Sequence, residues 1–182
     1  MHLTRRPLSR FWRDRRGVSA VEFALLAPVL IIFYFGMAEL TEAMMAQRRL
    51  SHLTASIGDV VARDQKFTDA RRDDLFSVGK VLMSPFPTST LRMCLVSIVS
   101  DATGKDVVAW SEPSNAPINC PAQGAVLNIP VSVLPAGQSV IMSKASYEYN
   151  SVFKFIVPQT LTFRRTYYLR PRLSEQVTRS KT

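Results

Sequence analysis

The feature that most constrains this chain is a long apolar run near its N-terminus. Residues 23–38 are apolar throughout, apart from the neutral breakers Pro28 and Gly36, and with residues 18–21 included the segment reaches Leu40. A helix that crosses a bilayer needs about 20 such residues, and this run is too long and uniform for a buried helix of a small domain. We therefore predict a transmembrane helix. Pro28 removes one backbone hydrogen bond, a loss that membrane helices tolerate.

Basic residues gather at the two ends of the chain. Residues 1–17 contain six Arg and one Asp (+5), residues 164–182 contain five Arg, one Lys and one Glu (+5), and the total of +9 leaves −1 for the middle. A nucleic-acid-binding protein carries its basic residues on one folded face or helix, so nucleic acid is not an expected partner. Positive flanks stay in the cytoplasm, which predicts a cytoplasmic N-terminus. The basic C-terminal residues 172–182 are expected to form a solvated tail.

Helical periodicity continues beyond the apolar run. Apolar residues return every three or four positions with polar residues between them, which is typical of an amphipathic helix. The stripe consists of Leu40, Ala43, Met44, Gln47, Leu50, Leu53, Ile57, Val60 and Val61. We predict one continuous helix from Val18 to about Arg63, roughly 70 Å long at 1.5 Å per residue, with His52 as a surface or packing residue.

A shorter helix and several strands are expected next. The helix begins at a capping Thr68 or Asp69 and ends before Pro85 and Pro87. Its predicted apolar side consists of Leu75, Val78, Val81 and Leu82. Strands are predicted at residues 91–100, 107–111, 125–133, 138–155 and 161–169, the third of them broken by Pro130. The expected fold is α+β, a long N-terminal helix followed by a small antiparallel β-rich domain.

Two cysteines, Cys94 and Cys120, have neither CxxC spacing nor a nearby His that would complete a zinc site. In an oxidising compartment such a pair is expected to form a disulfide. On the chain-entropy model, closing a loop of this length stabilises the fold by roughly 3–4 kcal/mol. Two buried free thiols are the alternative.

Motifs of catalysis are missing from the sequence. It contains no Gly-rich phosphate loop, no HExxH and no GxSxG, and it has only two His. Asp73 and Asp74 are adjacent, so on a helix their side chains point apart and do not form an acid/base pair. We expect no enzyme, no cofactor and no metal.

The beginning of the apolar helix carries a motif. An Arg pair precedes Gly17, four residues follow, and Glu22 stands at the fifth position after the glycine. This pattern at the start of an apolar helix resembles the leaders of type IV prepilins. Taken with residues 20–25, Pro28, Gly36 and Glu39, it resembles more narrowly the TadE-like pseudopilins of the tight-adherence (Flp) pilus system.

The resemblance implies roles for the residues of the motif. A prepilin peptidase would cut between Gly17 and Val18, and Glu22 would become the fifth residue of the mature chain. The Glu22 carboxylate would then meet the new Val18 amine of an adjacent subunit and set the axial register. Such pairing would offset the cost of a charge in the membrane, roughly 2.5–3.5 kcal/mol at a helix centre and less near the interface. The alternative is that Glu22 snorkels to the headgroups.

Packing between subunits is assigned to Glu22, Phe23, Pro28 and Glu39. Glu39 lies near the outer end of the span, where it either sits in the membrane interface or contacts a partner helix.

The predicted organisation has five parts. Residues 1–17 are a basic leader, 18–40 the transmembrane helix, 41–66 its extracytoplasmic continuation, 67–172 a small α+β domain and 173–182 a basic tail.

The resemblance implies a structural function, that of a minor pilin or pseudopilin that helps to initiate or assemble a tight-adherence (type IVc) pilus. It implies a single-pass protein of the bacterial inner membrane with a periplasmic domain. The implied partners are the prepilin peptidase, sister pseudopilins and the major pilin. The sequence leaves open whether the chain is TadE-like or TadF-like, and whether it enters the fibre. The alternative function is a membrane-tethered or secreted binding module with a Sec-type signal, which Glu22 and the length of the run disfavour.

Overall fold

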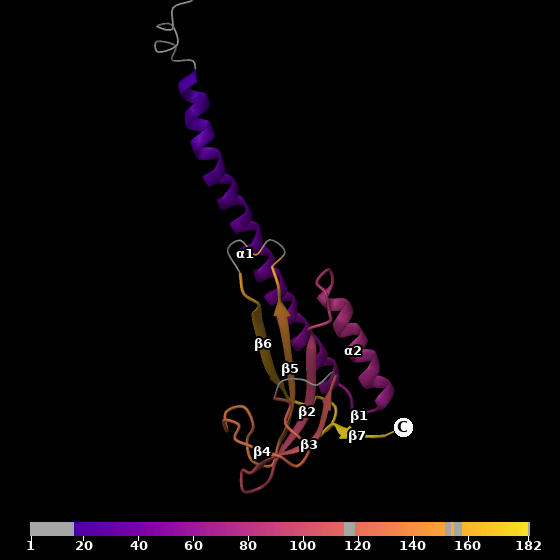
Figure 1. Cartoon of the computed structure of the whole chain (residues 1–182). Coiled ribbons are helices and arrows are strands. Elements are labelled where there is room, and N and C mark those ends of the chain that lie inside the picture. The colour runs from indigo at the N-terminus through magenta and orange to yellow at the C-terminus, as the bar shows by residue number, and fades with distance from the viewer. Residues whose placement is uncertain (1–16, 115–118, 152–153, 155–157, 182) are drawn as a thin grey trace, which may run out of the picture.

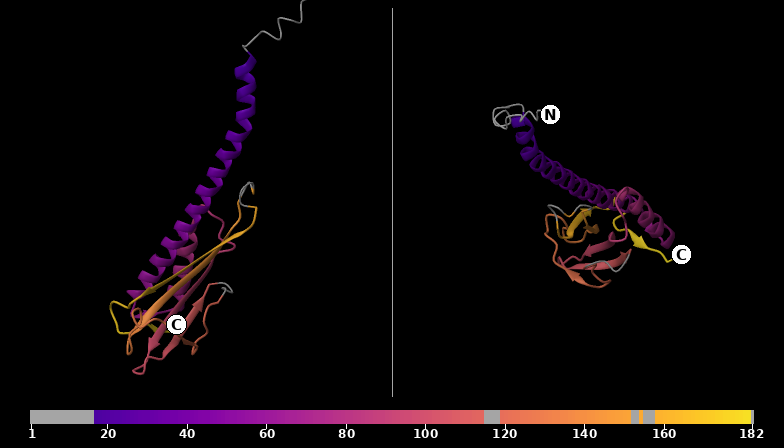
Figure 2. Two further views of the ribbon diagram at one scale, coloured as in Figure 1. Left: turned by 90° about the vertical axis from the view of Figure 1, so that its left-hand side faces the viewer. Right: turned by 45° about the horizontal axis from the view of Figure 1, so that its top comes forward.

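A computed structural model of the chain describes residues 17–114, 119–151, 154 and 158–181. Its dominant element is the helix α1 (Val18–Ala62), which confirms the prediction of one continuous helix. The N-terminal half of α1 extends far beyond the rest of the molecule (Figure 1). The helix passes through Pro28 without a break and curves along its length (Figure 2).

The domain is built on a five-stranded antiparallel sheet with the order β4-β3-β2-β5-β6. The strands are β2 (Arg92–Ser100), β3 (Asp106–Pro113), β4 (Val126–Leu127), β5 (Ser139–Tyr149) and β6 (Leu161–Leu169). The central strand β2 is buried on both faces of the sheet, which explains its nearly continuous apolar sequence. This arrangement confirms the predicted α+β class.

The outer half of α1 packs along β5 and β6, and the β5–β6 hairpin extends beside α1 toward its exposed half (Figures 1 and 2). Ala43 is buried as predicted, but the stripe of α1 differs from the predicted one at this end of the domain, because Leu40 and Met44 are exposed while Ala46 is buried. Small side chains there allow the helix to approach the domain closely. At Gly58 the approach is so close that an added Cβ would lie 2.6 Å from Leu169 Cδ1.

The second helix, α2 (Asp69–Met83), lies beside the outer end of α1 (Figure 1). The predicted cap is confirmed, since the Arg71 backbone N–H donates to Thr68 Oγ1. The predicted apolar side is wrong in two places, because Val78 is 48% exposed and Val81 is 72% exposed. The face that packs inward is rotated and consists of Leu75, Phe76, Gly79 and Met83.

Two predicted strands are shorter in the structure. The strand expected at residues 125–133 is reduced to β4, because Pro130 has no N–H and its carbonyl instead accepts from the N–H of Val133, which closes a turn. The strand expected at 138–155 ends at Tyr149. Its predicted end at Phe155 lies outside the described residues.

Apolar side chains cover both faces of the sheet. One core lies between the sheet and the two helices, and a second lies under residues 120–134 on the opposite face. Cys94 on β2 and Cys120 form a disulfide across this second core, with 6.0 Å between their Cα atoms. The disulfide prediction is therefore confirmed.

The C-terminal residues pack against the domain, so the prediction of a solvated tail is wrong. The Arg172 N–H donates to the Ala62 carbonyl at 2.8 Å, at the end of α1. Farther along, β7 (Thr178–Arg179) pairs in parallel with β1 (Lys66–Phe67). Val177 is fully buried. Backbone pairing and the burial of one apolar side chain order this segment despite its charge.

Candidate functional site

The candidate site begins with the exposed half of α1. Large apolar side chains from Val18 to Phe35 are uncovered, and their exposure ranges from 37% at Phe35 to 71% at Leu25. By length and composition, α1 is the one helix in the described ranges that could cross a membrane. A long apolar helix that the domain leaves bare fits a membrane protein.

Gly17 and Glu22 lie at the tip of this exposed half. Gly17 is the residue before the first turn, with φ −84° and ψ −13°, and no side chain caps the helix there. Among the described residues, no atom would come within 4 Å of a Cβ added at Gly17, so neither the backbone nor these residues require a glycine. Glu22 is exposed on the helix surface, as are Phe23 and Pro28.

Glu39 lies in a different environment from Glu22. It is 1% exposed, and its Oε1 accepts a hydrogen bond from Ser151 Oγ at 2.6 Å. Ser151 follows β5, so this hydrogen bond joins the domain to α1 near Gly36, the first buried residue of the helix. The side chain of Glu39 is thus held within its own chain, while its expected place in the membrane interface or against a partner helix stays a prediction. A carboxylate in such a place requires hydrogen-bond donors from its own domain.

Glu42 adds a second polar contact one turn farther out. Its Oε2 accepts a hydrogen bond from Tyr149 Oη at 3.3 Å. Burial raises the pKa of Tyr149, and the nearby Glu42 carboxylate raises it further. The hydroxyl therefore stays protonated and available as a donor over the whole neutral range.

Farther along α1, buried polar contacts fix the position of the helix on the sheet. Ser143 Oγ of β5 donates to the Thr54 carbonyl at 2.7 Å. Thr54 Oγ1 donates to the Leu50 carbonyl at 2.6 Å within the helix. Both contacts lie on the turns of α1 before Gly58, and together they hold the outer half of α1 as part of the domain core.

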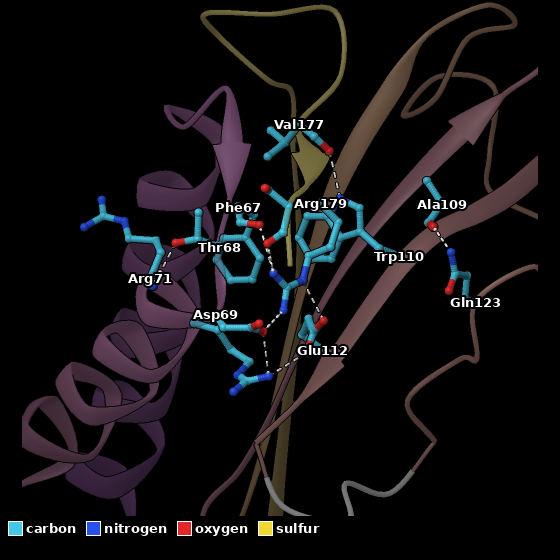
Figure 3. A network of polar contacts seen from close by, with 12 residues as sticks. Phe67, Thr68, Asp69, Arg71, Ala109, Trp110, Glu112, Gln123, Val177 and Arg179 are labelled. Atoms are coloured by element: carbon cyan, nitrogen blue, oxygen red, sulfur yellow. Dashed lines mark hydrogen bonds and ion pairs between the residues drawn. The ribbon is translucent and has the colours of Figure 1, made fainter. Parts of the chain in front are cut away.

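The far end of the domain is closed by Arg179 of β7 (Figure 3). Its guanidinium bonds to Asp69 at the start of α2 and to Glu112 of β3, the latter at 2.7 Å. Arg72 also reaches both carboxylates, so two Arg and two acids form one network. The hydrogen bond from Arg179 lowers the pKa of Asp69. Burial lowers the pKa of Arg179, but its bonds to Glu112 and Asp69 outweigh that and raise it.

Aromatic packing supports this network. Phe67 stacks on Trp110 with ring centroids 4.9 Å apart, and the Arg179 guanidinium lies 5.6 Å from the centre of the Phe67 ring. Trp110 Nε1 donates to the Val177 carbonyl at 2.8 Å. Sequence reasoning missed this cluster. Its members are far apart along the chain, and two-residue strands carry no periodic signal.

The structure thus divides the residues that the sequence singled out. Gly17, Val18, Glu22, Phe23 and Pro28 share the exposed half of α1. Glu39 lies where α1 meets the domain, and the disulfide between Cys94 and Cys120 lies on the face of the sheet opposite α1. Within the described residues, no group of three or more His, Cys, Asp or Glu side chains is arranged to hold a metal.

Comparison with known proteins gives one match. Residues 17–57 match the family described as TadE-like protein. Searches of curated proteins and of solved structures gave no match. The matched residues run from Gly17 through the exposed half of α1 and across the junction to Ile57. Over residues 17–57 the chain is therefore similar to TadE-like proteins, which confirms the resemblance seen in its sequence and suggests a component related to the Tad pilus.

Proposed function

We propose that this protein is a minor pilin or pseudopilin that helps to initiate or assemble a tight-adherence pilus. The observation that carries the proposal is the division of α1 into two halves. The inner half exposes apolar side chains on all sides, while the outer half is built into a folded domain. A helix of this kind can pack laterally with other membrane helices while its domain stays outside the bilayer.

The bilayer segment is proposed to be residues 18–35, shorter than the span of 18–40 expected from hydropathy. Gly36 and Glu39 are buried in the chain's own structure, so they are not available to lipid. Residues 18–35 rise about 27 Å at 1.5 Å per residue, close to the roughly 30 Å thickness of the hydrocarbon core. The domain would then rest directly on the outer surface of the membrane.

Processing after Gly17 is proposed as the step that matures the chain. Gly17 has ordinary helical dihedral angles and no contact within 4 Å of an added Cβ from residue 18 onward in the described chain, so the folded part of the chain does not explain a glycine there. A peptidase that must bring the scissile backbone into its active site does explain it, because the missing side chain allows close approach. The N-terminus would be cytoplasmic and the domain periplasmic.

The register proposal concerns Glu22 and the Val18 amine created by cleavage. Glu22 is four residues beyond Val18, about 6 Å along the helix axis. A neighbouring subunit would pair its amine with this carboxylate when the two helices are displaced axially by about that distance. Pairing would neutralise both charges in a low-dielectric environment.

The N-terminal sequence of the chain in the membrane fraction tests the proposed function. Mass spectrometry is expected to find a mature chain that begins at Val18 when the prepilin peptidase is co-expressed, and the full-length chain when it is not. A chain that begins at Glu39 or Gln47 would instead support a secreted module with a Sec-type signal. Cleavage before Gln47 would remove Glu39 and two buried alanines from the domain, which argues against that alternative.

A further inference from the structure

An open groove runs along the side of the domain between α1 and the edge strand β6. It has a volume of 510 Å³ and is lined by α1 residues between Met44 and Ala55 and by Arg165 and Tyr167 of β6. Ser51 forms part of its floor, where it receives hydrogen bonds from Arg165 Nε at 3.0 Å and Tyr167 Oη at 3.3 Å. The side chains that line the groove include Arg48, His52 and Arg165 but no carboxylate.

Strand β6 is the long free edge of the sheet. All nine of its residues pair with β5 on one side, and among the described residues no strand pairs with it on the other. The opposite edge of the sheet, β4, has only two residues. An edge strand of this length presents a row of backbone N–H and C=O groups that can accept another strand.

The charges along this edge are positive and lack acidic partners. Arg164 and Arg165 are adjacent on β6, so their side chains leave opposite faces of the sheet. Within the described residues, neither they nor Arg48 form an ion pair. The other arginines of the domain near acidic groups, such as Arg72 and Arg179, are paired. The edge therefore combines free strand-pairing groups with positive charge on both of its sides.

We propose that an extended acidic segment of a neighbouring protein adds to β6 as a sixth strand. Its backbone would pair with the free edge of β6, and alternate side chains would point to the two faces of the sheet. Carboxylates on one face would meet Arg164, and those on the other would meet Arg48 and Arg165 in the groove.

A second copy of this chain does not supply such a segment. Its closest cluster of carboxylates, Asp69, Asp73 and Asp74, lies on the helix α2, and Asp69 and Asp73 are already paired with Arg. Two β6 edges brought together would also oppose arginine to arginine, which destabilises strand pairing.

An anionic lipid headgroup does not match the site either. Arg48 lies thirteen residues beyond Phe35, about 20 Å along the helix, and so outside the proposed hydrocarbon segment by more than a headgroup layer. A lipid also offers no strand to pair with the free backbone of β6.

The test uses the full chain in detergent micelles and a fluorescent peptide of Thr-Thr-Glu-Glu repeats, as long as β6, because paired Glu residues place carboxylates on both faces of a strand. Fluorescence anisotropy at about 0.15 M ionic strength, where distant charges are screened, is expected to show binding. The substitutions Arg48→Glu and Arg164→Glu are each expected to weaken binding roughly fivefold or more, because each turns an attractive charge pair with the peptide into a repulsive one. Lys80→Glu, the same change of charge on the exposed face of α2, is the matched control and should leave the dissociation constant within about twofold.

A second peptide separates strand addition from simple charge attraction. The same Thr–Glu sequence with alternate backbone nitrogens methylated keeps every carboxylate but loses the N–H donors of one edge, and it is expected not to bind. The proposal is overturned if the parent peptide does not bind, if the methylated peptide binds equally well, or if Lys80→Glu weakens binding as much as Arg164→Glu. It is also overturned if vesicles with anionic lipid compete with the peptide at the site that contains Arg48.

Discussion

Glu22 and Glu39 are acidic residues on the same helix with opposite surroundings. Glu22 is exposed among apolar side chains that the domain does not cover, whereas Glu39 is buried against Ser151. A buried carboxylate with a donor in its own chain has a structural role there, whereas an exposed one is accessible to a partner from outside. Replacing Glu22 should therefore affect assembly, whereas replacing Glu39 should affect the stability of the domain.

Replacing Glu22 by Ala is expected to leave membrane insertion, cleavage after Gly17 and folding of the domain unchanged while reducing pilus assembly. The physical reason is that the substitution removes the proposed partner of the Val18 amine and no internal contact. Counting pili by electron microscopy measures the effect, and the mature mass verifies cleavage. Normal piliation in the Glu22→Ala strain would show that the carboxylate does not guide packing.

Replacing Glu39 by Ala is expected to lower the free energy of unfolding of the domain by roughly 1–3 kcal/mol, the cost of leaving a buried polar partner such as Ser151 unsatisfied. Chemical denaturation of the detergent-solubilised chain measures this. Glu39→Gln is the control, since it keeps an acceptor oxygen and should lose less stability than Glu39→Ala. Equal stability of the alanine variant and the unmodified chain would contradict a structural role for the Glu39–Ser151 contact.

At the scale of elements, the C-terminal strand β7 closes the domain. It joins the start of α2 to β3 through Arg179, whose side chain is only 10% exposed. β7 pairs with β1 over only two residues. Most contacts that hold this segment on the domain therefore involve side chains: the ion pairs of Arg179 and the hydrogen bond from Trp110 Nε1 to the Val177 carbonyl. Such a segment depends on a few strong contacts rather than on a long hydrogen-bonded ladder.

Arg179→Ala is expected to lower the free energy of unfolding by roughly 2–3 kcal/mol, since it leaves Glu112 and Asp69 without their closest cation. Lys181→Ala, an exposed change in the same segment, should stay within about 0.5 kcal/mol. Both values come from denaturation curves. Loosening of the segment should also appear as faster hydrogen exchange at Thr178 and Ser180, whose N–H groups bond to residues 65 and 67. Equal stability of the two variants would mean that Arg179 is not a main attachment of β7.

At the scale of the whole molecule, a continuous helix joins a membrane-type segment to a domain whose sheet is covered on both faces. The disulfide lies on the face opposite α1, far from the junction at Glu39. Stability of the domain and packing of the exposed half of α1 should therefore be separable.

Reducing the disulfide is expected to destabilise the domain by roughly 3–4 kcal/mol, since it closes a loop with a sequence separation of 26 residues. Denaturation with and without a thiol reductant measures the loss. The helix content of α1 should change little before the domain unfolds. An unchanged denaturation midpoint after verified reduction would contradict this expectation.

Low pH should weaken the contacts that hold β7 on the domain. Arg179 holds the pKa of Asp69 below its ordinary value, so this carboxylate stabilises the fold above the ordinary carboxyl pKa of about 4. The stabilisation is then lost as the pH falls through the lower pKa of the folded state. Thermal unfolding between neutral pH and about pH 3 measures it, and the acid sensitivity should be smaller in Asp69→Asn. Equal pH dependence of the two chains would exclude Asp69 as a contributor.

The sequence by itself determined the elements whose signal is local and repeated. The apolar run and its helical stripe gave α1 from Val18 to Ala62, alternation gave β6 from Leu161 to Leu169, and the motif at Gly17 and Glu22 gave the similarity to TadE-like proteins. Only the tertiary structure decided what covers each surface. Hydropathy did not predict that Glu39 is buried and bonded to Ser151, or that Val78 and Val81 are exposed to solvent. It also did not predict that the basic C-terminal segment is held on the domain by the ion pairs of Arg179 with Asp69 and Glu112. Periodicity depends on neighbours along one helix or strand. Burial and ion pairing instead depend on residues that the fold brings together from far along the chain, such as Arg179 and Glu112, 67 positions apart, and Glu39 and Ser151, 112 positions apart.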